Sequence, residues 1–325
     1  MNEPSVLFIS WAEDCSRSDN IARQLGGKSV MVYSPEWGSR YATILAKYVS
    51  QAWKTLTLLR ETRPSVVFVM TPPTVACAPV WLYGLFTGTP FIIDAHSGAF
   101  LLPRWKRVLF LHRFFSRRAL STLLTNPFLD GIVRSWGART TIVPDVPVKL
   151  PDPRPWPMKA QRNITLVCTF STDEPVHVFF EAARASPHIQ FFVTGDPSTA
   201  DPALLAGKPE NVTLTGFIPR ADYAGLLLAS DAIMTMTTRD NTMQRGAYEA
   251  IYAGKPVITA NQPFLRQEFA RGTVHVDLTP DGISTGFRRL YENLDGLTRE
   301  AGILRDQKKA RWERVSAELR ELMVR

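Results

Sequence analysis

The sequence predicts an α/β fold made of two Rossmann-like domains and a long C-terminal helix. Strand-like apolar runs alternate with helical segments through both halves of the chain, which is typical of βαβ units and a parallel sheet. A span with four prolines, 148–162, interrupts this alternation, and proline fixes φ and removes a backbone donor. The 325 residues suffice for two domains of roughly 150 residues each. We therefore place a first domain at 1–150 and a second domain, with the terminal helix, at 151–325.

The expected strands are short, apolar and rich in β-branched residues. Those of the first half are VLFIS (6–10), SVMVYS (29–34), SVVFVM (65–70), FIIDA (91–95), STLLT (121–125) and TTIVP (140–144). Those of the second half are NITLVCTF (163–170), IQFFVTG (189–195), NVTLTGF (211–217), AIMTM (232–236), PVIT (256–259) and TVHVD (273–277). The terminal helix is expected from about Leu297 onward. Ligands of such sheets bind beyond the carboxyl ends of strands, so the site is expected in a cleft between the two domains.

The composition indicates a globular protein without a membrane span. Apolar residues make up 45% of the chain and charged residues 21%, which disfavours disorder. No run approaches the roughly 18 uninterrupted apolar residues that a span needs. The first residues, MNEPSVLFISW, lack a basic leader followed by an apolar core, which disfavours secretion. We therefore expect a cytoplasmic protein.

The formal net charge of +8 suggests an anionic partner. Bases alternate with apolar side chains in 103–118, which is interpreted as a basic amphipathic helix able to contact an anionic membrane surface. A helix packed on its own sheet with a solvated basic face remains an alternative. Nucleic acid is not expected as a partner, because aromatic and basic residues do not form a platform outside this segment. The six bases concerned are Arg104, Lys106, Arg107, Arg113, Arg117 and Arg118.

The residues that most often bind metals are scattered. Cys15, Cys77 and Cys168 show no CxxC spacing, so neither a disulfide framework nor a structural zinc site is indicated. The five histidines are far apart in sequence, and no two aspartates stand two positions apart. No metal site is therefore expected.

The second half carries a familiar succession of short motifs. LTGFIPRADYAGLLLASDAIMTM (214–236) and then RGAYEAIYAGKPVI (245–258) resemble the C-terminal domain of glycosyltransferases with the GT-B fold, particularly the family 4-like group. The likeness covers about Val212 to Asn261 closely. It implies the GT-B fold, with two Rossmann-like domains, a cleft between them and a C-terminal helix. It also implies a nucleotide diphosphate sugar as donor substrate and no cofactor.

Three shorter segments are similar to a subgroup. VMTPPT (69–74), IDAHSG (93–98) and TFSTDE (169–174) resemble motifs of chitobiosyl-diphospholipid mannosyltransferases and related bacterial enzymes. That resemblance implies a glycan or lipid-linked acceptor, and with it a peripheral position at the inner face of the membrane.

In this resemblance Glu249 is the central acid of the donor site. It would bind the ribose diol of the nucleotide, since a carboxylate can accept hydrogen bonds from both hydroxyls; an ordinary exposed helical Glu is the alternative. Asn241, Thr242 and Met243 are expected to start the helix, with Asn241 or Thr242 as its cap. Their N–H groups would bind a diphosphate or a sugar hydroxyl, or they would simply cap the helix. Arg245 could add positive charge.

The sequence departs from the family pattern at two places. Asn241 stands where the family often has an acid, and Ser171-Thr172-Asp173-Glu174 replaces its frequent Arg and Lys. Ser171 and Thr172 are expected at a helix start, where they would bind phosphate or only cap the helix. Gly216 and Phe217 fit the loop that cradles the base, with packing in the core as the alternative for Phe217.

In the first half, His96 ends the fourth strand and is expected to face the cleft. It would bind the donor sugar or transfer a proton, or it is a structural histidine. Asp94 would orient it at most. Ser16, Arg17 and Ser18 stand at the first helix start, where Arg17 and Ser18 could contact a phosphate or the acceptor; a surface Arg is the alternative.

Together with the resemblance, these observations predict a metal-independent glycosyltransferase of the hexosyltransferase kind. It would move a sugar from a nucleotide diphosphate sugar to an acceptor in cell-envelope or polysaccharide synthesis. Positive dipoles and side chains would stabilise the departing nucleotide diphosphate. Two alternatives remain: a nucleotide-sugar epimerase of the same fold, and a non-catalytic two-lobed protein that binds a nucleotide or metabolite.

Overall fold

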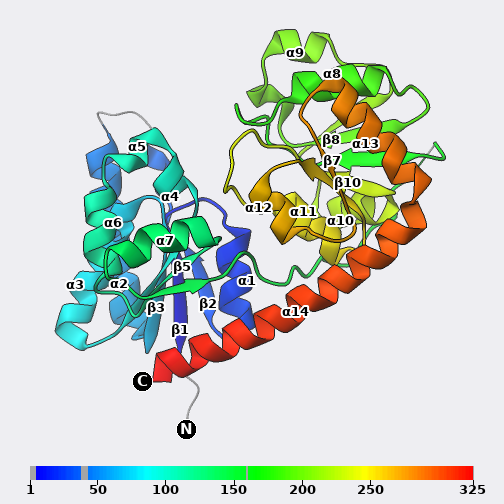
Figure 1. Cartoon of the computed structure of the whole chain (residues 1–325). Helices are drawn as coiled ribbons and strands as arrows, with labels where there is room; N and C mark the ends of the chain where they lie inside the picture. Colours follow the sequence, from blue (N-terminus) through cyan, green and yellow to red (C-terminus); the bar gives the residue numbers. More distant parts are fainter. Residues whose placement is uncertain (1–4, 38–42, 159, 325) are drawn as a thin grey trace. The chain divides into compact units, whose positions relative to one another are not determined.

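The computed structural model describes residues 5–37, 43–158 and 160–324. The chain divides into two compact units: residues 1–146 together with 311–325, and residues 147–310. Each unit contains one parallel six-stranded sheet with helices around it (Figure 1). This is the predicted GT-B type of architecture, with every expected strand present within a few residues of its expected ends.

The first sheet has the order β2-β1-β3-β4-β5-β6. Its strands are β1 (Val6–Ser10), β2 (Lys28–Met31), β3 (Val66–Thr71), β4 (Phe91–Ala95), β5 (Ser121–Leu124) and β6 (Thr140–Ile142). The helices of this unit are α1 (Ser16–Gln24), α2 (Ile44–Thr62), α3 (Cys77–Thr87), α4 (Gly98–Leu101), α5 (Pro103–Lys106), α6 (Leu109–Ser116) and α7 (Pro127–Ser135), with the 3₁₀ turns η1 (Pro35–Trp37) and η2 (Thr74–Ala76). The central strands β1, β3 and β4 are buried along their whole length, as strands covered on both faces must be.

The second sheet has the order β12-β11-β10-β7-β8-β9. Its strands are β7 (Asn163–Leu166), β8 (Gln190–Thr194), β9 (Val212–Gly216), β10 (Ala232–Met234), β11 (Val257–Ala260) and β12 (Thr273–Val276). The helices that begin in this unit are α8 (Val176–Arg184), α9 (Pro202–Ala206), α10 (Arg220–Ala229), α11 (Arg245–Tyr252), α12 (Pro263–Glu268), α13 (Pro280–Glu292) and α14 (Leu294–Val324), with the 3₁₀ turn η3 (Pro197–Thr199).

In both sheets, successive strands along the chain are added first on one side of the first strand of the unit and then on its other side. In the second sheet the chain passes from β7 outward to β8 and β9, and β10 then pairs on the other side of β7. The loops that follow β7 and β10 therefore diverge at their carboxyl ends, which is where open α/β sheets bind ligands. In the first sheet the corresponding point lies between β1 and β3.

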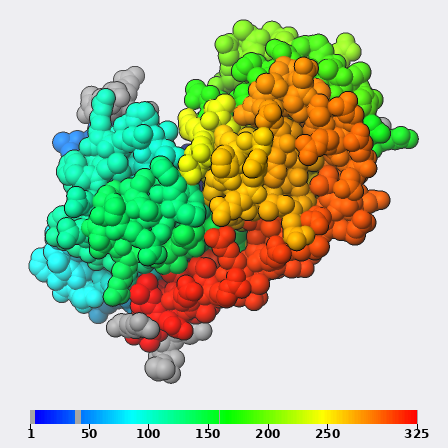
Figure 2. Space-filling model, in the orientation of Figure 1, coloured from blue at the N-terminus to red at the C-terminus, as the bar shows by residue number. Residues whose placement is uncertain are grey.

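The terminal helix α14 is a single helix of 31 residues and is visible as such in Figure 1. Its last part belongs to the first unit, whereas we expected the whole helix in the second domain. Trp312, Leu319 and Met323 are buried in the core cluster that also contains Val6 and Phe8. Figure 2 shows this red end of the chain against the cyan and green surface of the first unit. Spaced apolar positions therefore anchor the helix end to the first sheet.

The proline-rich span is packed along the second unit. The N–H of Arg154 donates to the carbonyl of Ala221 at 3.0 Å, and its guanidinium pairs with Asp222 at 2.9 Å. A Cβ on Gly225 would lie 1.7 Å from the carbonyl oxygen of Arg154. Only glycine on α10 allows this approach, so the span expected as an interdomain linker is held to α10.

The expected helix over 103–118 is two short helices in the structure. Helix α5 ends at Lys106 and α6 begins at Leu109, so a single amphipathic helix was a wrong prediction. The six bases of the segment are nevertheless exposed. Among the described residues, no helix is long and apolar enough to cross a membrane.

Candidate functional site

In the first unit, a buried ion pair lies at the carboxyl end of β4. Asp94 is fully buried, and Arg17, from the first turn of α1, donates to it through Nε at 3.1 Å and through Nη2 at 3.0 Å. The same guanidinium donates to the carbonyls of Val143 and Pro144 at 2.8 and 3.0 Å. Arg17 therefore joins α1, β4 and the segment after β6. Its donors point at protein oxygens, which does not favour the expected contact with a phosphate.

The charges of this pair stabilise each other. Burial alone would raise the pKa of Asp94, but Arg17 and His96 lower it to about 2. Burial would also lower the pKa of Arg17, but Asp94 and Asp145 raise it. Both side chains therefore remain ionised at neutral pH, as a buried pair must to offset its desolvation.

His96 follows β4 and lies next to this ion pair. Its Nε2 lies 3.3 Å from Oδ2 of Asp94, an ion-pair distance without good hydrogen-bond alignment. Its side chain is 32% exposed, whereas Nε2 itself is buried and has no hydrogen-bond partner. Burial alone would lower the pKa of His96, but Asp94 and Cys15 raise it to about 9. The imidazole is thus protonated near neutral pH, where it donates hydrogen bonds or stabilises negative charge and is a poor base.

Ser18 lies beside this group but points into the protein. It is fully buried, and its hydroxyl is 2.7 Å from the hydroxyl of Ser10 and 3.0 Å from Sγ of Cys15. These contacts position the thiol of Cys15 and do not favour the expected contact of Ser18 with the acceptor or a phosphate.

In the second unit, Asp173 joins the two loops that diverge at the switch point. Its carboxylate accepts from the hydroxyls of Ser171 at 2.6 Å and Thr237 at 2.7 Å. Its carbonyl accepts from the N–H of Thr238 at 2.8 Å. Arg239 pairs with the carboxylate at 3.2 Å. The loops after β7 and β10 are therefore held together by one acid.

Glu174 shapes the same loop from inside. Its Oε2 accepts from the N–H groups of Thr169 and Ser171 at 2.8 and 2.9 Å. Burial raises the pKa of Glu174 even though these bonds act in the opposite direction. Ser171 and Thr172 are not at a helix start, contrary to expectation, because α8 begins at Val176. Thr172 is exposed, with its hydroxyl 3.5 Å from Nη2 of Arg239.

The central acid of the second unit, Glu249, lies one turn into α11. Its Oε2 accepts a 2.5 Å hydrogen bond from the hydroxyl of Tyr223 on α10. Its Oε1 lies 3.4 Å from Nε of Arg245, one turn earlier on the same helix. The Glu249 side chain is 16% exposed, so its carboxylate is fixed by protein groups yet accessible. Burial and Glu249 raise the pKa of Tyr223 well above its ordinary value, so this phenol stays a donor.

The loop before α11 differs from the prediction. The helix begins at Arg245, and its N-cap is Gln244, which makes no side-chain cap bond. Asn241, Thr242 and Met243 therefore precede the helix, and the N-cap position is not that of Asn241 or Thr242. Asn241 has a φ of 55°, in the left-handed region that asparagine tolerates better than most residues. Its N–H donates to the Asp240 side chain at 2.7 Å. A local turn of the backbone, and not a cap, therefore occupies the expected helix start.

Gly216 ends β9 and Phe217 follows it, as expected for a loop at the ligand edge. Gly216 has a φ of 65°, a left-handed backbone conformation that favours glycine. A Cβ at this position would meet no atom within 4 Å, so the backbone conformation, and not lack of space, explains the glycine. Phe217 is 82% exposed, which rules out a core role for its ring. An aromatic ring this exposed at the edge of the sheet is available for stacking.

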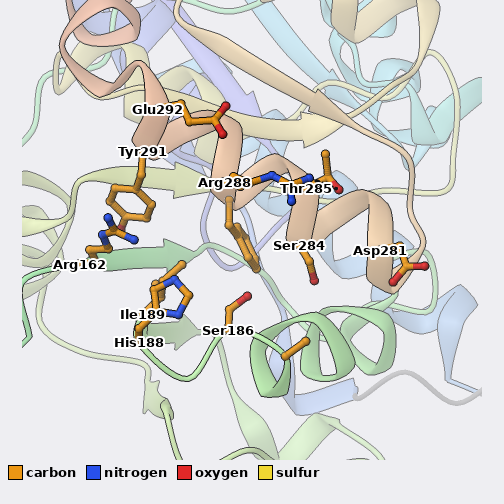
Figure 3. A pocket seen from close by; sticks show the side chains of 12 residues that line it. Arg162, Ser186, His188, Ile189, Asp281, Ser284, Thr285, Arg288, Tyr291 and Glu292 are labelled. Carbon is orange, nitrogen blue, oxygen red and sulfur yellow. Dashed lines mark hydrogen bonds between the residues drawn. The ribbon is translucent and has the colours of Figure 1, made fainter.

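A separate hollow of about 540 Å³ lies in the second unit, but not at the ligand edge. Arg162 and His188 line it (Figure 3), and they precede β7 and β8. The hollow therefore opens at the amino ends of the strands, opposite the loops described above. The α13 residues Ser284, Arg288 and Tyr291 form its other wall.

Several residues of the two groups described above had no role assigned from the sequence. They are Cys15, Tyr223, Asp173 and Arg239. Tyr223 could have been found, because it follows the Gly-Phe-Ile-Pro motif on the same loop-to-helix segment. Within 5–37, 43–158 and 160–324, no group of three or more His, Cys, Asp or Glu is placed to hold a metal ion.

The fold was compared with known proteins. No protein-family model matches the sequence, and no curated protein matches it. Among solved structures, HepE of Anabaena in complex with UDP and glucose is similar at a TM-score of 0.73, with 13% identity over 99% of both chains. Sucrose-phosphate synthase of Thermosynechococcus elongatus is similar at a TM-score of 0.71, with 13% identity over 98% of both chains. A Listeria monocytogenes protein assigned as a UDP-N-acetylglucosamine 2-epimerase reaches 0.60, with 13% identity over 93% of this chain and 91% of the other.

These neighbours define the class by fold. Glycosyltransferases with two Rossmann-like domains match this chain along nearly its whole length, so the chain has the GT-B fold. Identities of 12 to 18% among the glycosyltransferase matches establish the architecture and leave donor and acceptor to be inferred from the site.

Proposed function

We propose that this protein is a glycosyltransferase that takes a sugar from a nucleotide diphosphate sugar. One observation carries the proposal: Glu249 is held by Tyr223 and Arg245 in the first turns of α11, beside the switch point of the second sheet. A fixed, accessible carboxylate is suited to a ribose diol. The sequence resemblance to GT-B enzymes assigns the ribose to this same acid.

The phosphates would meet positive potential close to Glu249. The N-cap residue of α11, Gln244, makes no side-chain cap bond, and the N–H groups and dipole at a helix start favour an anion. Arg245 and Arg239 stand on this helix and on the loop before it. Such groups can stabilise a leaving diphosphate without a divalent metal, and we propose metal-independent transfer.

UDP is the first nucleotide to test, because HepE was solved with UDP. We expect UDP, or another nucleoside diphosphate in a screen with ADP and GDP, to raise the unfolding temperature. At a hundred times its dissociation constant a ligand adds about 2.7 kcal/mol of stability. Glu249→Gln should lose most of this shift, whereas Glu181→Gln, at an exposed position of α8, should keep it. If no nucleoside diphosphate shifts the wild-type protein, the proposal fails.

The acceptor is proposed to be a lipid-linked or cell-envelope glycan, reached by peripheral contact with a membrane. Leu45, Val49 and Trp53 lie four residues apart on α2 and are 73%, 62% and 68% exposed. Helix α2 packs against α3, where Phe86 is 83% exposed. Such an apolar stripe with exposed bases on the nearby α5 and α6 suits an anionic lipid surface.

An epimerase is the second candidate, favoured by the fold match to the Listeria protein. Incubation of the nucleotide sugar without any acceptor distinguishes the two. An epimerase converts the sugar, and a transferase gives at most slow hydrolysis.

A further inference from the structure

We propose that the hollow at the amino ends of β7 and β8 binds a small polyol phosphate, with the phosphate at Arg162 and Arg288 and the hydroxyl groups toward Asp281. The hollow lies within the second unit, at the ends of these strands opposite the loops of the proposed donor site. The proposal goes beyond the proposed function and does not depend on it.

The hollow lies between two walls (Figure 3). One wall is a face of α13 that carries the lining positions 281, 284, 285, 288, 291 and 292. These positions recur three or four residues apart, so their side chains share one side of the helix. The other wall is the turn between α8 and β8, together with Arg162 before β7. The volume of about 540 Å³ is typical of pockets that hold small molecules.

Protein hydrogen bonds fix both walls. Nδ2 of Asn211 donates to three carbonyls of the segment between α8 and β8, at 2.9 to 3.0 Å. On the other wall, the hydroxyl of Tyr291 donates to Asp231 at 3.1 Å. A ligand therefore meets a preformed surface, and little binding free energy is lost in ordering it.

Two arginines make one part of the hollow cationic. Arg162 lies over the Tyr291 ring, with its guanidinium carbon 4.7 Å from the ring centre, and this stacking leaves the in-plane N–H donors available. Arg288 donates to the hydroxyl of Thr285 at 3.3 Å. In the part of the chain that the structure describes, neither guanidinium forms an ion pair with a carboxylate. His188 lines the same hollow and adds a ring donor. Such a group of donors suits the several oxygens of a phosphate.

The two acids of the hollow are placed apart from these donors. In Figure 3 the carboxylate of Glu292 points away from Arg162, and Asp281 lies at the other end of the helix face. Two turns of α13, about 10 Å of rise, separate Asp281 from Arg288. A carboxylate accepts hydrogen bonds from hydroxyl groups but repels a second phosphate. This charge pattern favours a molecule with a phosphate at one end and neutral hydroxyl groups at the other.

Hydroxyl side chains line the hollow between its two ends. They belong to Ser186, Ser284 and Thr285. The hydroxyl of Ser284 donates to the Pro280 carbonyl at 2.8 Å, so its lone pairs remain to accept from a ligand. The lining therefore suits a ligand whose own hydroxyls donate to these oxygens and to Asp281, as those of a polyol phosphate do.

Isothermal titration calorimetry with sorbitol 6-phosphate, inorganic phosphate and sorbitol tests the site without any activity assay. We expect sorbitol 6-phosphate to bind, inorganic phosphate to bind about tenfold more weakly, and sorbitol not to bind. Arg162→Gln and Arg288→Gln should each weaken the binding of sorbitol 6-phosphate about tenfold, because each removes hydrogen bonds to a charged group. Arg289→Gln is the matched control, since Arg289 is the exposed next residue of α13 and does not line the hollow. Circular dichroism checks the fold of each variant.

Two further measurements locate the ligand. Asp281→Ala should weaken the binding of sorbitol 6-phosphate but not that of inorganic phosphate. Saturating UDP should not displace sorbitol 6-phosphate, and Glu249→Gln should bind it like the wild type. Absence of sorbitol 6-phosphate binding, an unchanged affinity in both arginine variants, or displacement by UDP would overturn the proposal. Binding of sorbitol 6-phosphate by a wild-type protein that binds no nucleoside diphosphate would contradict the proposed function and support this site.

Discussion

The hydroxyl of Tyr223 donates a 2.5 Å hydrogen bond to Oε2 of Glu249 and so joins α10 to α11 at the ligand edge of the second sheet. This bond fixes the rotamer of the acid proposed to bind the ribose. It also occupies one lone pair of the carboxylate, while Oε1 lies 3.4 Å from Nε of Arg245. A donor site built this way depends on a tyrosine that does not itself need to touch the ligand.

Tyr223→Phe is therefore expected to weaken nucleoside diphosphate binding about tenfold. A hydrogen bond to a charged group contributes about 1.5–3 kcal/mol, and about 1.4 kcal/mol corresponds to a factor of ten. Isothermal titration calorimetry with UDP measures the change. Tyr291→Phe is a matched control, because Tyr291 also donates to an acid, Asp231 at 3.1 Å, but lies at the pocket of Figure 3. Equal affinities of Tyr223→Phe and wild type would contradict the role of this bond.

The pH dependence of the first unit should reflect His96. Its pKa in the folded protein is raised to about 9, above the ordinary value near 6.5. The stabilisation it provides is thus complete below about pH 6.5 and is lost as the pH rises through about 9. We expect the unfolding temperature of the wild type to be higher than that of His96→Gln at pH 6 and equal to it at pH 10. Thermal unfolding from pH 6 to 10 measures this. His112 offers an internal comparison, since burial lowers its pKa to about 4 and it stays neutral over this range.

The sequence predicted the strands well because their signal is local. Short apolar runs such as 65–70 and 91–95 can only be buried strands in this alternation, and the parallel order follows from the helices between them. The predictions for Gly216 and Glu249 also rest on local motifs, each on a single loop or helix, and the roles of these residues stay predictions.

What the sequence did not predict depends on partners distant along the chain. Arg17 was expected to contact a phosphate or the acceptor, or to lie at the surface, yet it pairs with Asp94, 77 residues later. Tyr223 meets Glu249 across 26 residues, and Asp173 joins a loop 64 residues away. Local propensity also failed at the start of α11. Asn241 has a left-handed backbone conformation, and the helix starts two or three residues later than a cap at Thr242 or Asn241 would place it.

Loss of the buried ion pair should destabilise the first unit strongly. Arg17→Ala leaves Asp94 without its main partner at a fully buried site, and breaking such a pair costs about 3–5 kcal/mol. Urea unfolding followed by circular dichroism measures the loss. Arg134→Ala is the control, because the pair of Arg134 with Asp130 is an i,i+4 pair with a 63% exposed Arg side chain, worth at most about 1 kcal/mol. Similar losses in the two variants would argue against a structural role of Arg17.

Two glycine substitutions should have opposite effects. In Gly225→Ala the new Cβ would meet the Arg154 carbonyl at 1.7 Å, so α10 and the proline-rich span must move apart and stability falls. In Gly131→Ala, on α7, nothing lies within 4 Å of the new Cβ, and the helix gains about 0.5–1 kcal/mol from the alanine. The unfolding temperature of each variant checks this pair. A stabilised Gly225→Ala would show that the span is not held to α10.

Membrane contact should depend on the apolar stripe of α2. Replacing Leu45, Val49 and Trp53 together by Ser removes side chains that are 62–73% exposed, so the fold should be retained while vesicle binding is lost. Sedimentation with vesicles containing phosphatidylglycerol at low salt measures binding, and circular dichroism checks the fold. Leu228→Ser together with Ile303→Ser, at exposed positions of the second unit, is the control and should bind like the wild type.

Binding should also weaken with added salt, because the bases of α5 and α6 act through a screened potential. Failure of the wild type to bind anionic vesicles at low salt would contradict a membrane-bound acceptor site, while nucleotide binding by the second unit would be unaffected.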